Sequence, residues 1–95
     1  MKGGNVNEFI DHISYGDELV FLYNNRKLFL QGWYKEGVYE MMLDQWEPTP
    51  SSFQGYIWKF SADSMSKCAD AFLDAPIFDG KKFWDVENQI EWVDA

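Results

Sequence analysis

The chain has 95 residues, a length that accommodates one domain because two hydrophobic cores rarely form below about 100 residues. Hydrophobic residues make up 46% and aromatic residues 19% of the chain, a content that excludes a disordered protein. Eight Lys and Arg against 16 Asp and Glu give a formal net charge of -8, which argues against nucleic acid and anionic membranes as direct partners.

The sequence gives no indication of an internal disulfide, a signal peptide or a membrane-spanning segment. Cys68 is the single cysteine, so we expect no internal disulfide. The N-terminal region lacks the apolar run of a signal peptide, and the longest unbroken apolar stretch, 19–23, is far shorter than a bilayer span. We therefore expect a cytoplasmic protein without a membrane-spanning segment.

The N-terminal segment has the pattern of a short helix. Asn5 suits the cap position, and apolar residues from Val6 onward recur at i, i+3, i+4 and i+7, which places them on one helical face. Gly16 suits the left-handed position that follows a last turn. The pattern predicts a helix over 6–14.

The pattern then changes to that of a strand-and-turn segment. Runs of β-forming residues separated by turn residues predict a meander of four strands at 19–23, 28–34, 38–46 and 55–60. The first turn is predicted at Asn24-Asn25, because asparagine tolerates a positive φ. Between the last two strands, two prolines predict an irregular loop over 47–52, because proline cannot donate to a strand ladder.

The C-terminal third returns to helical spacing. Apolar residues at i, i+3, i+4 and i+7 predict a helix over 65–75, which Pro76 stops. An Asp-Gly turn follows at 79–80. Beyond it, the segment 82–93 fits either a helical face or an edge strand, and we expect a short helix over 82–88 with an extended tail.

These elements predict an α+β fold. It consists of a four-stranded antiparallel meander sheet, an N-terminal helix, and one or two C-terminal helices packed mainly on one face. The 5 Trp, 5 Tyr and 8 Phe exceed what the core of such a chain needs. We therefore expect exposed rings on the uncovered sheet face, either Trp33, Trp46 and Trp58 or the residues of opposite parity.

No motif for catalysis, a cofactor or a metal is found. His12 has no Ser or Cys nucleophile placed near it, and Cys68 lies in an apolar stripe, where cysteine behaves as a small hydrophobe. Glu40 and Asp44 share one face of a strand but lie about 13 Å apart along it, too far for a glycosidase pair. The sequence therefore predicts a non-catalytic protein with no cofactor and no metal.

Acidic residues are concentrated beyond residue 62, where they alternate with aromatic residues. Aromatic side chains supply buried area at protein interfaces, and carboxylates steer a basic partner into register. The alternative is that these residues form the solvated side of the helices. The first hypothesis is a small acidic module that docks a basic protein partner, and its predicted binding residues are Phe83, Trp84, Asp85, Glu87, Glu91 and Trp92.

Two other functions stay open. One is an obligate homodimer that hides the aromatic sheet face. The other is a small-ligand or enzyme pocket with Glu40 or Asp44 as the proton acceptor, lined by Trp33, Trp46, Tyr56 and Trp58. In size and charge the chain resembles the small acidic immunity proteins with which bacteria neutralise basic toxins. This resemblance rests on composition and transfers no site residue.

Overall fold

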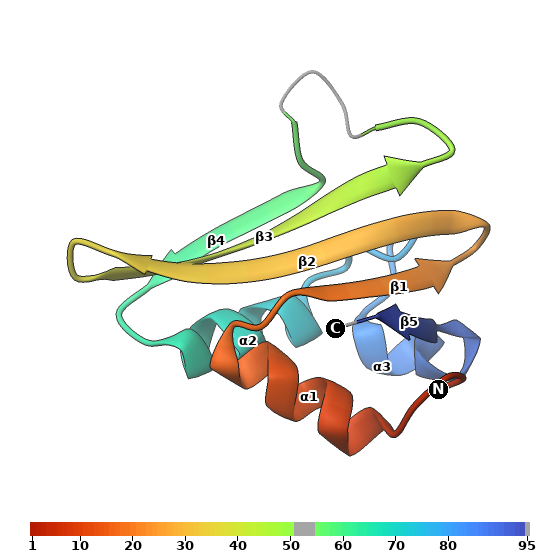
Figure 1. The fold of residues 1–95 in the computed structure, drawn as a ribbon, viewed down its shortest axis with the longest axis horizontal. Helices are drawn as coiled ribbons and strands as arrows, with labels where there is room; N and C mark the ends of the chain where they lie inside the picture. Colours follow the sequence, from red (N-terminus) through yellow and green to blue (C-terminus); the bar gives the residue numbers. More distant parts are fainter. Residues whose placement is uncertain (51–54, 95) are drawn as a thin grey trace.

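The structure is a computed structural model that describes residues 1–50 and 55–94 (Figure 1). Its elements, in chain order, are α1 (Val6–Tyr15), β1 (Leu19–Tyr23), β2 (Arg26–Lys35), β3 (Val38–Glu47), β4 (Trp58–Ala62), α2 (Met65–Asp74), α3 (Phe83–Val86), the 3-10 turn η1 (Glu87–Gln89) and β5 (Glu91–Asp94). The predicted α+β class is therefore confirmed. No helix of the described part of the chain is long and apolar enough to span a membrane.

The sheet has five strands in the order β4-β3-β2-β1-β5, all pairs being antiparallel. The predicted meander of β1 to β4 is confirmed, whereas the number of four strands is wrong. The predicted extended tail is a fifth strand, because it pairs with the free edge of β1, where Phe21 faces Trp92. On its other side, the Trp92 N–H donates to the Lys2 carbonyl at 2.8 Å.

The local signals at the first helix and the tight turns agree with the structure. The Asn5 side chain accepts hydrogen bonds from the backbone of Asn7 at 2.8 Å and Glu8 at 3.3 Å, and so caps α1. The β1–β2 turn places Asn24 at φ 49° and Asn25 at φ 62°, which is the geometry of a type I′ hairpin.

The bounds of two later segments differ from those predicted. β4 begins at Trp58 rather than at residue 55, because pairing with β3 starts where Trp58 faces Leu43. The predicted loop 47–52 ends outside the described residues. Residues 82–93, predicted to be either helix or strand, contain both: the short helix α3, the η1 turn and β5.

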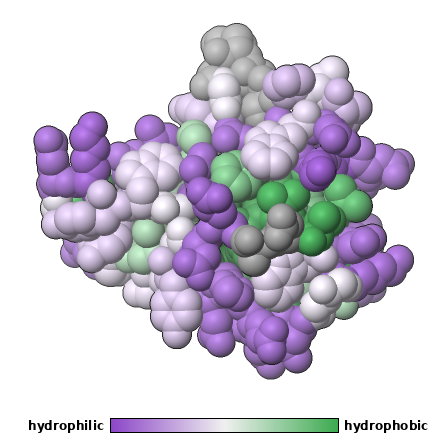
Figure 2. Space-filling view, in the orientation of Figure 1, coloured by the Kyte–Doolittle hydropathy of each residue, from purple (hydrophilic) through white to green (hydrophobic). Residues whose placement is uncertain are grey.

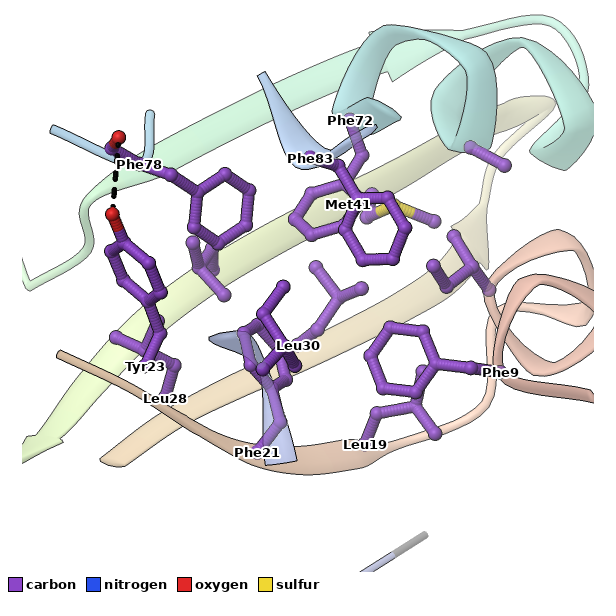
Figure 3. Packing of buried hydrophobic residues seen from close by; sticks show 14 of the residues in the cluster. Phe9, Leu19, Phe21, Tyr23, Leu28, Leu30, Met41, Phe72, Phe78 and Phe83 are labelled. Atoms are coloured by element: carbon purple, nitrogen blue, oxygen red, sulfur yellow. Dashed lines mark hydrogen bonds between the residues drawn. The ribbon is translucent and has the colours of Figure 1, made fainter. Parts of the chain in front are cut away.

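The three helices of the described residues all lie on one side of the sheet (Figure 1), and the core lies between the helices and the sheet. Five phenylalanines that are completely buried form its centre, mostly in edge-to-face or tilted pairs (Figure 3). They are Phe9, Phe21, Phe72, Phe78 and Phe83. Much of the aromatic content of the chain is thus inside, and Cys68 is buried with it, as its sequence position predicts.

The segment between α2 and α3 is tied to the end of β1. The Tyr23 hydroxyl donates to the Phe78 carbonyl at 3.4 Å (dashed in Figure 3) and to Asp79 at 3.2 Å. Burial, followed by the hydrogen bond to Asp79, raises the pKa of Tyr23. These bonds hold the long connection against the sheet.

Candidate protein-binding surface

The sheet has one covered and one uncovered face, because side chains alternate along each strand. The buried residues of β1, β2 and β3 point toward the helices, and their neighbours point the other way. We call this second side the open face. Its apolar members are Val20, Leu22, Phe29, Trp33, Met42 and Trp46, and its polar members include Lys27, Gln31, Glu40, Asp44 and Lys59.

An aromatic stack stands on the open face. The rings of Phe29 and Trp46 are 4.6 Å apart between centroids and inclined by 26°. A bulge in β3 produces this contact: Gln45 faces Leu28 and the next paired residue is Glu47, so Trp46 is the extra residue and leans over Phe29. Trp46 remains 46% exposed. Figure 2 shows hydrophobic side chains gathered over β1 and β2, with hydrophilic residues around them.

Asp44 lies beside this stack. It faces Phe29 across the β2–β3 ladder, and Met42 and Trp46 precede and follow it on the same face. The side chain is partly exposed, but its Oδ1 is shielded from solvent and has no hydrogen-bond partner among the described residues. Burial raises the pKa of Asp44. This carboxylate is therefore held in apolar surroundings without a charge partner.

The second carboxylate of the predicted ligand pocket behaves differently. Glu40 forms an ion pair with Lys59 of the neighbouring strand at 3.2 Å. Glu40 and Asp44 share the open face, as their spacing predicts, but only Asp44 lacks a partner within the described part of the chain.

The three tryptophans predicted to share the exposed sheet face are divided between its two sides. Trp46 is exposed on the open face, and Trp33 is half-buried there, opposite Glu40. The placement of Trp58 on the open face is wrong, because it pairs with the buried Leu43 and so points to the helix side. There its ring packs edge-on against Phe72 at 5.6 Å. A pocket that combines Trp58 with Trp33 is therefore not formed.

Three of the six predicted C-terminal binding residues pack in or against the core or form an ion pair. Phe83 is completely buried, and Trp92 packs edge-on against Phe9 at 5.3 Å. Glu87 forms an ion pair with the Met1 ammonium. The alternation of acidic and aromatic residues suggests a binding role for all three residues, but it does not show which of these side chains are held by contacts within the molecule.

The other three predicted residues are exposed but separated. Trp84 is 55% exposed and, with Leu73, lines a hollow of about 390 Å³ between α2 and α3. Asp85 accepts a hydrogen bond from the Lys82 N–H at 3.1 Å and so caps α3. Glu91 instead lines a second hollow, of about 510 Å³, at the β1–β2 hairpin. The C-terminal segment thus does not form one continuous surface.

Within residues 1–50 and 55–94, no group of three or more His, Cys, Asp and Glu side chains is placed to hold a metal. His12 pairs with Asp17 at 2.8 Å and packs edge-on against Trp92.

The sequence-based prediction did not include two apolar residues of the open face. Phe29 and Leu22 received no role, although their parity opposite to the buried Leu28 and Phe21 would have placed them on the open face. The shielding of Asp44 has no sequence signal, because it depends on the bulge that brings Trp46 over Phe29.

Comparisons with known proteins assign no family, since no family model, curated protein or solved structure matches the chain.

Proposed function

We propose that the chain is a non-catalytic protein-binding module whose open face docks a basic partner protein. The observation that carries this proposal is the exposed Trp46, stacked on Phe29 on a sheet face that no described helix covers. Tryptophan is among the residues that contribute most to binding at protein interfaces. A sheet face on which exposed aromatic and aliphatic residues lie beside polar ones has the composition of such an interface.

The charge of the chain favours a basic partner over a second copy. A formal net charge of -8 on a chain of 95 residues attracts a basic protein and steers its approach. Two copies that meet through their open faces bring the same charge together and place two unpaired Asp44 carboxylates in one interface. Self-association through this face is therefore disfavoured at neutral pH.

The small-ligand alternative has weaker support. Its proposed lining residues lie on both sides of the sheet, since Trp58 contacts Phe72 while Trp46 contacts Phe29. Its proton acceptor Glu40 is engaged with Lys59. A docking surface on the open face needs only the residues of that side and requires no closed pocket.

The proposal is tested with two matched tryptophan variants. The immobilised wild-type chain is exposed to a panel of purified basic and acidic proteins at low and raised salt, beside Trp46→Ala and Trp84→Ala. We expect retention of basic proteins, weakened by salt, lost in Trp46→Ala and kept in Trp84→Ala, because Trp84 is exposed on the helix side. Salt-independent retention, or loss in Trp84→Ala alone, contradicts the proposal.

Sedimentation velocity distinguishes the homodimer alternative from the proposed docking of a basic partner. A dimer of the wild-type chain at neutral pH that becomes a monomer in Trp46→Ala would show that the open face binds a second copy instead.

A further inference from the structure

Resting on the proposed function, we infer that Asp44 determines which partners the open face accepts: docking places one cationic side chain, an Arg guanidinium or a Lys ammonium, against its carboxylate. The surface then recognises a basic residue flanked by apolar residues, and not basic charge in general.

Asp44 has unmet hydrogen-bonding capacity. Its Oδ1 is shielded and unpartnered among the described residues, which is unfavourable for a polar group and more so for a charged one. The basic residues of the open face do not relieve it. Lys59 is held by Glu40 at 3.2 Å, and the ladder sets Lys27 opposite Glu47.

Docking would change the solvation of the Asp44 carboxylate. Met42 and Trp46 flank Asp44 on the same face of β3, and Phe29 faces it from β2. A partner that covers these side chains therefore removes the remaining water from Asp44. A purely apolar partner leaves a buried, unpaired charge, which opposes binding. A partner with a cation at this point supplies a charge-assisted hydrogen bond instead. Asp44 therefore rejects the first partner and admits the second.

The neighbouring carboxylate and aromatic ring favour Arg over Lys as the cationic side chain. A guanidinium is planar, donates in pairs to a carboxylate and stacks on aromatic rings. The exposed ring of Trp46 lies two residues from Asp44 on the same face. One Arg side chain can thus contact both groups, through hydrogen bonds to Asp44 and a cation–π contact with Trp46.

A phage library of random dodecapeptides provides the probe. Phage are selected on the wild-type chain after depletion on Trp46→Ala, which keeps peptides that need the open face. The enriched peptides are synthesised, and their dissociation constants are measured for the wild type, Asp44→Asn and Glu40→Gln. Glu40→Gln is the matched control, since it removes a carboxylate of the same strand and face that already has a partner.

We expect the enriched peptides to carry Arg or Lys beside aromatic or aliphatic residues. Asp44→Asn should weaken their binding about tenfold or more, as for other buried charge pairs, and Glu40→Gln about threefold or less. Replacing the basic residue of a peptide by Gln should abolish the difference between the wild type and Asp44→Asn. Circular dichroism and two-dimensional NMR spectra of Asp44→Asn should match those of the wild type.

The outcomes separate the two proposals. Peptides that require Trp46 but lack a basic residue, or bind Asp44→Asn as tightly as the wild type, overturn the role of Asp44 and leave the docking function standing. Failure to enrich any peptide that requires Trp46 overturns the docking function, and the role of Asp44 with it.

Discussion

Asp44 couples the binding surface to the stability of the fold. Because burial raises the pKa of Asp44, the folded chain holds this proton more tightly than the unfolded chain. The stabilisation from its protonation therefore appears as the pH falls through the raised pKa and is lost at neutral pH. We expect Asp44→Asn to raise the free energy of unfolding by about 1 kcal/mol at neutral pH, the lower end of the range for an unsatisfied buried group.

Urea denaturation of both proteins at neutral and mildly acidic pH checks this sign. The difference between Asp44→Asn and the wild type should shrink as the pH falls, since the wild-type carboxyl becomes neutral. The charged neighbours on this face, the Glu40–Lys59 pair and Lys27 opposite Glu47, are present in both proteins. A variant that is less stable than the wild type at neutral pH would show that Asp44 has a stabilising contact. Gain in stability with loss of binding is typical of a residue kept for function.

At the scale of elements, short sequence patterns predicted the caps and turns that depend only on neighbouring residues. The Asn5 cap and the Asn24-Asn25 turn were readable from the sequence because each needs only a few adjacent residues. The sequence left residues 82–93 open between a helix and an edge strand, because β5 forms only by pairing with the distant β1, where Phe21 faces Trp92. For the candidate surface, strand parity is enough to group Trp46 with Asp44 on one side of β3, whereas the side on which Trp58 lies depends on the register of β4.

The packing of α1, α2 and β2 depends on a close approach at Gly32. A Cβ at this position would lie 3.0 Å from the Gly16 Cα and 2.9 Å from the end of Met65. The Gly32 N–H also donates to the Gly16 carbonyl at 3.2 Å. We expect Gly32→Ala to lower the free energy of unfolding by about 1–3 kcal/mol, the usual effect of overpacking.

Urea denaturation measures this effect, and Gly37→Asn is the control. Gly37 has φ 83° in an open turn, where a Cβ would meet no described atom within 4 Å, and Asn tolerates such a backbone. The control should change stability by about 0.5 kcal/mol or less. Equal stability of Gly32→Ala and the wild type would mean that the end of α1 does not rest on β2 in the way the structure places it.

At the scale of the whole molecule, the net negative charge opposes the self-association that an exposed apolar face favours. All helices lie on one side, so the apolar residues around Phe29 and Trp46 face outward. A net charge of -8 at neutral pH keeps such chains apart by mutual repulsion. This repulsion disappears near the isoelectric point of about 4.4. Burial raises the pKa of Asp44 and so favours the neutral form of this carboxyl as the pH falls.

Self-association should therefore appear near that pH and not at neutral pH. We expect static light scattering of the wild-type chain to rise as the pH approaches the isoelectric point. Trp46→Ala should reduce the rise, because it removes the exposed ring of the open face, and Trp84→Ala should leave it unchanged. The two variants lose the same side chain and keep the same charge, so a difference between them reports position alone. Equal scattering from both would mean that the open face makes no special contribution, and that neutralising the charge is enough to cause association through any part of the surface.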